Sequence, residues 1–309
     1  MTETVGTREA SVGNAGAVES RVSTDAGSGA RPSAARSGRR VRVPGIGAII
    51  SILFLLFLVV AAFFPEALTH YKPLEIDPTQ ALLPPSFQHL FGTDQSGRDV
   101  FTRVVYGTSA SLSIGIIATA LGLVIATALG VAAGLGGRLA DGAIGRFLEI
   151  LFAFPSLLLA LLFVTMFGAN VTTLVIAVGL GSAPGYARMI RGQVIAIKNA
   201  AYVEASYVLG HSRIRVLWRT ILPNAMRPLI VLGTLGVGQS IVWASSLSFL
   251  GLGAAPPAPE WGAMLAAGRD FIGTAWWTEL FPGAIIVGIT LATTTLGRLI
   301  QRRFEGRTN

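Results

Sequence analysis

Few side chains in this 309-residue sequence could do chemistry, and their spacing excludes most kinds of catalysis. The absence of cysteine excludes both a disulfide framework and a thiolate metal site. Lys198 follows Gly192, but the second glycine and the Ser or Thr of a phosphate-binding loop are missing. The apolar runs offer Ser182 as a nucleophile but contain no histidine to activate it. We therefore expect a protein that is not an enzyme and binds no metal or cofactor itself.

The acidic residues also allow few functional sites. Asp94 and Asp99 share a polar segment, but two carboxylates supply too few oxygen ligands for Ca²⁺. We expect a turn there, followed by an interfacial helix. Arg146 and Glu149 can pair on one helix face, either as a structural pair or as part of a gate. The long apolar runs contain hardly any other ionisable residue, which argues against coupling to protons or sodium.

Composition indicates a protein embedded in a lipid bilayer. Hydrophobic residues make up 52% of the sequence and charged residues only 13%, against about a quarter charged in soluble domains. The apolar residues form runs of about 20, enough to cross the hydrocarbon layer as a helix. The net charge of +8 does not indicate nucleic-acid binding, because the arginines gather beside the apolar runs, as in membrane proteins of fixed orientation.

The apolar runs predict six membrane-spanning helices. The predicted spans are residues 46–64, 109–135, 144–167, 170–187, 229–250 and 281–299. Most of the 24 Lys and Arg residues lie in the N-terminal tail, in alternate connecting segments and at the C-terminal end. Positive residues favour the cytoplasmic side, so both termini are predicted to be cytoplasmic.

These spans divide the chain into four parts. Residues 1–44 carry almost no large apolar side chains and are expected to form a disordered cytoplasmic tail. Residues 45–107 comprise the first span and an extracytoplasmic segment. Residues 108–300 form a core of five spans, and residues 301–309 form a cytoplasmic end.

Local patterns predict how the spans pack. Gly130 and Gly134 form a GxxxG motif, which lets helix backbones approach closely in lipid. Pro155 should kink the third span. Trp276 and Trp277 precede the last span and are predicted to belong to an interfacial aromatic belt.

The basic segment 198–227 contains two predicted short helices. Residues 200–209 form the first, and Gly210 should end it in the left-handed conformation. Ser212 is the predicted N-cap of the second helix, which Pro223 should close. Its predicted apolar face consists of Ile214, Leu217, Trp218 and Ile221. We call this pair of short helices in segment 198–227 the elbow. It suits docking into a groove of a partner. The residues alone are also compatible with an amphipathic loop that lies on lipid headgroups.

One motif in this segment resembles a known family. An acidic residue, a glycine and a Leu-Pro pair stand at the spacing of the EAA loop of binding-protein-dependent ABC importer permeases. The matching residues are Glu204, Ala205, Ser206, Gly210, Ile221, Leu222 and Pro223. Ser206 replaces the second alanine of the family triplet, and it is small enough to keep the contact.

Further motifs resemble the "C" branch of the dipeptide/oligopeptide and nickel permeases, in which we expect them to be structural. They include Gly92, Thr93, Asp94, Gly97, Arg98, Asp99, Pro155, Arg188, Gly251, Gly253, Pro257, Trp261 and Gly262. The resemblance covers about residues 45–297. The C-terminal end departs from the family pattern from Arg298 onward, which puts any contact there in doubt.

The resemblance implies an all-α polytopic protein of the bacterial inner membrane, with six transmembrane helices and the type I (MetI-like) importer fold. It implies a heterodimer with a second permease, two cytoplasmic ABC ATPases that bind ATP and Mg²⁺, and an extracytoplasmic solute-binding protein. The implied cargo is di- or oligopeptides, with nickel chelates or other small solutes as the alternative. The residues that bind cargo are unknown. A self-sufficient secondary carrier or channel is the alternative of a different class.

Overall fold

The computed structural model describes residues 46–305, and this part of the chain is helical. The predicted tail 1–44 and the last four residues lie outside the described residues. The α-helices are α1 (Ile46–Phe63), α2 (Val100–Leu135), α3 (Gly137–Ala153), α4 (Ser156–Phe167), α5 (Val171–Lys198), α6 (Ala201–Val208), α7 (Arg213–Val216), α8 (Leu222–Phe249), α9 (Trp261–Gly268) and α10 (Trp277–Glu305). Short 3₁₀ turns, among them η2 (Pro78–Gln80), and one π-helix, η3 (Leu217–Ile221), complete the fold.

Five stretches of the described residues are long and apolar enough to cross a membrane, and a bent pair of helices makes a sixth if it is counted as one span. The prediction for the third span was too simple, because α3 and α4 meet at 88° instead of forming one kinked helix. Pro155 causes the break: it has no N–H to donate, and it holds Phe154 in an extended conformation.

Four other helices, α2, α5, α8 and α10, are longer than the spans predicted for them, and α2 and α5 show the reasons. Helix α2 begins at Val100 rather than 109, because the Asp99 carboxylate accepts the N–H of Thr102 and caps the helix there. Helix α5 continues to Lys198 rather than 187, through a stretch whose charges had indicated a loop. Both helices therefore extend past the apolar runs that marked them.

Helices α2 and α5 form the most extensive contact in the fold, and small residues bring their backbones together. A Cβ on Gly130 would lie 2.8 Å from the carbonyl oxygen of Ala187, and one on Gly134 would lie 2.6 Å from Val194 Cγ1. The predicted close approach at the GxxxG motif is confirmed, and α5 is the partner helix.

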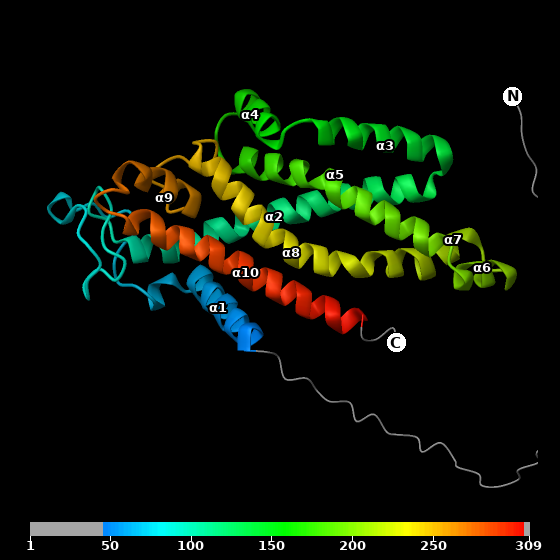
Figure 1. Cartoon of the computed structure of the whole chain (residues 1–309), viewed down its shortest axis with the longest axis horizontal. Coiled ribbons are helices and arrows are strands. Elements are labelled where there is room, and N and C mark those ends of the chain that lie inside the picture. Colours follow the sequence, from blue (N-terminus) through cyan, green and yellow to red (C-terminus); the bar gives the residue numbers. More distant parts are fainter. Residues whose placement is uncertain (1–45, 306–309) are drawn as a thin grey trace, which may run out of the picture. The chain divides into compact units, whose positions relative to one another are not determined.

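The remaining helices pack around this pair. Helix α8 lies against α2, where Thr119 Oγ1 and Ser240 Oγ are 2.9 Å apart. Helix α10 packs on α8, and α1 packs on α10. In Figure 1 the loop 65–99 and α9 lie at one end of these helices, whereas α6 and α7 lie at the opposite end.

Replacing Gly130 with leucine should disrupt the α2–α5 interface, because the new side chain must displace the α5 backbone. We expect the free energy of unfolding to fall by about 1–3 kcal/mol, the usual cost of overpacking, with a lower melting temperature in detergent. Gly192→Leu on α5 is the matched control, since a Cβ there meets no heavy atom within 4 Å. Equal melting temperatures for the two variants would contradict the close packing.

Candidate functional site

The predicted elbow exists and is fixed to the core by one apolar cluster. Val203 of α6 is fully buried against Val216 and Ile221. Leu135, at the end of α2, and Ile197, near the end of α5, pack against the same cluster. The short helix α6 is therefore in direct contact with the ends of the two helices that form the main interface.

The turn between the two short helices follows the prediction at Gly210. This glycine has a φ of +80°, and its N–H donates to the Tyr207 carbonyl at 2.9 Å. The N–H of His211 donates to the Ser206 carbonyl at 3.2 Å, so the two bonds end α6 in a left-handed cap. Ser212 occupies the predicted N-cap position of α7, but its side chain donates and accepts no capping hydrogen bond.

For the second short helix, both the predicted apolar face and the predicted C-terminal end were wrong. Four α-helical residues are followed by the π-helix η3, which runs on into α8. Hydrogen bonds in a π-helix join residues five apart instead of four. Residues at α-helical spacing therefore no longer lie on one face of this helix. Ile221 is buried, whereas Ile214 and Trp218 are 72% and 65% exposed. Pro223 lies directly after η3, near the start of α8, and does not close the helix.

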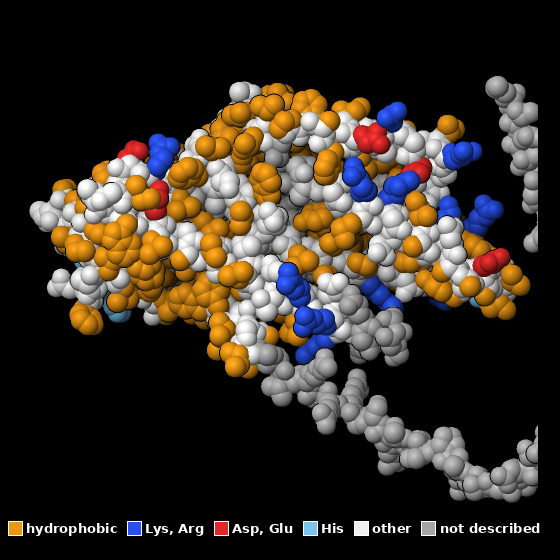
Figure 2. Space-filling model, in the orientation of Figure 1, with side chains coloured by type: hydrophobic (Ala, Val, Ile, Leu, Met, Phe, Trp, Pro, Cys, Tyr) orange, Lys and Arg blue, Asp and Glu red, His pale blue; other side chains and the backbone are white. Residues whose placement is uncertain are grey.

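The outer surface of the elbow carries both apolar and charged side chains. Its exposed apolar side chains are Tyr202, Tyr207, Val208, Leu209, Ile214 and Trp218, and its exposed charged side chains are Glu204, Arg213, Arg215 and Arg219. Ala205 is exposed beside Glu204, and Ser206 is half-buried. Figure 2 shows hydrophobic side chains at this end of the described part, next to basic ones. Apolar side chains gathered on an exposed protrusion are typical of a protein contact.

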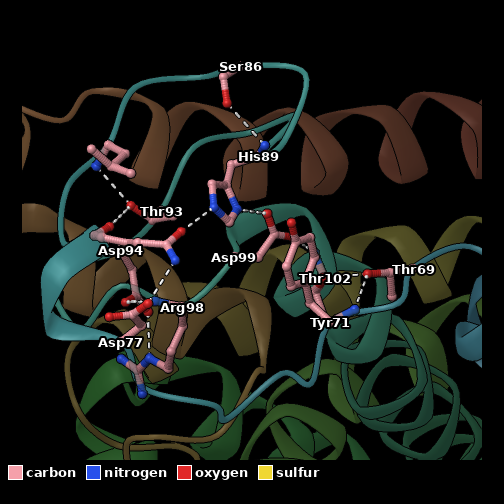
Figure 3. A network of polar contacts seen from close by, with 12 residues as sticks. Thr69, Tyr71, Asp77, Ser86, His89, Thr93, Asp94, Arg98, Asp99 and Thr102 are labelled. Atoms are coloured by element: carbon pink, nitrogen blue, oxygen red, sulfur yellow. Dashed lines mark hydrogen bonds and ion pairs between the residues drawn. The ribbon is translucent and has the colours of Figure 1, made fainter.

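The predicted turn around Asp94 is confirmed at the opposite end of the helices (Figure 3). The Asp94 carboxylate accepts the N–H groups of Ser96 and Arg98 at 2.8 and 3.0 Å. It also pairs with the guanidinium groups of Arg98 at 2.7 Å and Arg103 at 3.6 Å. Gly97 has a φ of +75° and packs on the backbone of Asp77, so the acid organises this loop through protein donors.

A second polar group joins this loop to the start of α2. The ring of His89 bridges Asp99 Oδ2 at 2.9 Å and Gln80 Oε1 at 2.7 Å. The amide of Gln80 donates to Asp77 Oδ2 at 2.7 Å. Hydrogen bonds from the side chain and the backbone of Thr79, and from Gln80, lower the pKa of Asp77 below its usual value. The sequence prediction did not include His89 and Gln80 in this group, because only the folded loop brings these side chains close to Asp99.

The second polar loop, residues 250–260, packs on the first part of α2. Glu260 is only 1% exposed and caps α9 by accepting the N–H groups of Gly262 and Ala263 at 2.8 and 2.9 Å. The hydroxyl of Ser248 donates to the same carboxylate at 2.5 Å. A Cβ on Gly262 would lie 2.7 Å from the Ser245 backbone, so this glycine lets α9 lie on α8.

Two indoles and one guanidinium tie the loops together. Trp261 is fully buried, and its Nε1 donates to the carbonyl oxygen of Val104 at 3.0 Å. Trp277 Nε1 donates to the Thr93 carbonyl at 3.0 Å. Arg103 Nη2 donates to the Pro257 carbonyl at 3.3 Å. We call this set of loops and bonds, residues 65–104 and 250–278, the cap.

The prediction of an interfacial belt was half wrong. Trp276 is half-exposed, but Trp277 is only 5% exposed and holds the cap. The sequence could not distinguish the two neighbours, because which of them faces the protein depends on where α10 begins.

Most of the residues predicted to be structural meet in the cap. These are Gly92, Thr93, Asp94, Gly97, Arg98, Asp99, Gly251, Gly253, Pro257, Trp261 and Gly262. Pro155 and Arg188 lie elsewhere. The Arg188 guanidinium stacks over the ring of Phe152, 4.9 Å from its centroid, and so links α5 to α3.

Two ion pairs involve α3. Arg146 and Glu149 pair at 3.0 Å, as predicted, and both are well exposed. No sequence pattern indicated the second pair, in which Arg191 of α5 binds both oxygens of Asp141 on α3. Those two residues are 50 positions apart and meet only because α3 and α5 lie side by side.

Comparison with known proteins places these features in a family. Residues 126–309 match the family described as "Binding-protein-dependent transport system inner membrane component". The dipeptide transport system permease protein DppC of Alkalihalophilus pseudofirmus is 40% identical over 81% of this chain and 82% of its own length. The di/tripeptide permease protein DppC of Pseudomonas aeruginosa is 39% identical over 81% and 85%. The glutathione permease protein GsiD of Pectobacterium atrosepticum is 39% identical over 81% and 83%.

Solved structures resemble the fold at lower identity. An inward-facing methionine ABC transporter, MetNI, matches with a TM-score of 0.54 and 17% identity, covering 65% of this chain and 96% of that one. An amino acid ABC transporter with bound histidines matches with a TM-score of 0.55 and 18% identity, covering 66% and 94%. The predicted all-helical type I importer fold is therefore confirmed. The chain belongs to the family of multi-pass inner-membrane components of binding-protein-dependent transport systems.

Proposed function

We propose that this chain is the permease subunit of an ATP-driven peptide importer, and that its elbow receives the force from partner ATPases. The single observation that carries the coupling role is the construction of the elbow. Its outer face exposes Leu209, Ile214 and Trp218, while its inner face buries Val203 among side chains from α2 and α5. A partner that grips the outer face therefore moves the ends of two core helices.

The coupling works through two states of the assembly. Two partner subunits bind ATP and Mg²⁺, close on each other and draw the elbow with them. Because η3 is continuous with α8, the pull reaches α8 as well as α2 and α5. Nucleotide binding then favours one orientation of the helices through contacts far from the cargo path, and hydrolysis resets it.

The proposed orientation places the elbow and both termini in the cytoplasm and the cap outside. Arg213, Arg215 and Arg219 of the elbow support this, since basic residues favour the cytoplasmic side. The cap then faces the solute-binding protein that delivers cargo, and the second permease completes the path as a heterodimer.

The proposed cargo is di- or oligopeptides. Relatives about 40% identical are named as dipeptide, di/tripeptide and glutathione permease proteins. The solute-binding protein, rather than this chain, is proposed to select the cargo. Nickel chelates or other small solutes are therefore the alternative cargo for the same architecture.

Leu209→Glu should weaken capture of the ATPase subunits, because it places a charge in the exposed apolar surface of the elbow. We expect at least a tenfold rise in the apparent Kd, a hot-spot effect of about 1.4 kcal/mol or more, measured by titrating ATPase onto the immobilised permease pair. Leu139→Glu is the matched control, since Leu139 is 90% exposed near the start of α3, outside the elbow. Equal weakening by both variants would count against docking at the elbow.

Gly210→Val should uncouple ATP hydrolysis from transport, because a β-branched residue is strained at a φ of +80°. The added side chain has space, since a Cβ there meets no heavy atom within 4 Å, so the fault lies in the backbone alone. Gly210→Asn is the control, as asparagine tolerates this conformation. We expect cargo-stimulated ATPase activity to fall at least about fivefold in the valine variant, for a strain of about 1–2 kcal/mol, and to stay near wild type in the asparagine variant. Full activity of the valine variant would show that coupling does not require the left-handed turn at Gly210.

Reconstitution in liposomes separates the importer from a self-sufficient carrier. The full complex should accumulate a labelled tripeptide only with ATP and the solute-binding protein present. The chain alone, given a proton or sodium gradient, should accumulate none. Gradient-driven uptake by the chain alone would establish the carrier instead, and ATP-driven uptake of a nickel chelate without peptide uptake would correct the cargo.

A further inference from the structure

We propose that His89 is a buried proton-binding site, and that its second proton fastens the outer loop of the cap to the start of α2. The ring is 5% exposed and lies between two elements (Figure 3). Its Nδ1 faces Asp99 Oδ2 at 2.9 Å, and its Nε2 faces Gln80 Oε1 at 2.7 Å. An ionised carboxylate only accepts hydrogen bonds, and so does an amide oxygen. Both ring nitrogens must carry hydrogen for both bonds to exist.

The amide of Gln80 is not free to reverse. Its Nε2 donates to Asp77 Oδ2 at 2.7 Å, and turning the amide would place its oxygen against that carboxylate. Asp77 is held in place in turn, because its Oδ1 accepts the Thr79 N–H at 3.0 Å and the Thr79 hydroxyl at 2.6 Å. The donor and acceptor roles in the group are therefore fixed from Asp77 inward. With Asp99 ionised, only the imidazolium form of His89 satisfies all of them.

The ring has acidic and aromatic neighbours. Asp99, at the N-cap of α2, is the charged group in direct contact, and Asp77 of the outer loop acts through Gln80. The ring of Tyr71 lies beside the imidazole, with centroids 5.2 Å apart. The neighbouring Asp94 is already paired with two guanidinium groups.

Loss of one proton has a defined result. The carboxylate of Asp99 retains the proton on Nδ1, so the proton on Nε2 leaves for water. The lone pair of Nε2 then faces the amide oxygen of Gln80, and that bond becomes a repulsion. The contribution is therefore present only while both ring nitrogens carry hydrogen. The η2 turn loosens, while the start of α2 keeps its cap.

Hydrogen exchange in the purified complex can measure this loosening. The reporters are the N–H groups of Gln80, Leu82 and Leu83, which donate to Asp77, Asp94 and Thr93. After correction for intrinsic exchange, we expect their protection to fall about 5- to 30-fold between about pH 5.5 and 8, as for one buried hydrogen bond lost. His89→Gln should lack the pH step, and His70→Gln, an exposed histidine, should keep it.

A second variant separates the proton from mere packing. In Asp77→Asn the amide replaces Oδ2 with a donor, while its remaining oxygen still accepts from Thr79. Gln80 can then turn and donate to neutral His89, so protection should stay high across the whole pH range. A pH step as large as that of the wild type in Asp77→Asn would overturn the proposal, and so would a wild-type protein without a step.

Discussion

The close approach of α2 and α5 is the constraint on which the rest of the structure depends. Gly130 and Gly134 bring the two backbones into contact along a shared face. Two helices packed this tightly in lipid cannot slide past each other without losing many short contacts. The pair therefore behaves as one body. The elbow is attached at the end of that body, and the cap encloses its opposite end.

The cap solves a different problem, since loops outside the spans must satisfy their own polar groups. It does so with buried acids that accept backbone N–H groups, among them Asp94, Asp99 and Glu260. Indole and guanidinium donors then join segments more than 150 residues apart in the sequence. These bonds explain why the family motifs, scattered along the chain, lie in one place. They serve the architecture, and the elbow is where we propose that a partner is engaged.

Much of this could be predicted from the sequence, and the failures have physical causes. Apolar runs located the spans because burial in lipid needs about 20 residues, but they missed the polar ends of α2 and α5, which capping and packing decide. Gly210 was predictable because its conformation is a local property. The exposure of Trp218 was not, because a π turn shifts the face of the helix, and neither was the pairing of Asp141 with Arg191, which only the packing of α3 on α5 creates.

The tethers of Trp261 and Trp277 have a mechanical consequence. They bind α9 and the start of α10 to the first turns of α2 and to the preceding loop, so the helices are fastened together at that end. Any rocking of the bundle must then pivot there. Helix α2 has 36 residues, about 54 Å at 1.5 Å per residue. A tilt of about 6° about such a fulcrum moves its far tip by about 5 Å, roughly one helical turn. A small rotation at the fastened end thus displaces the opposite end of α2 by several Å.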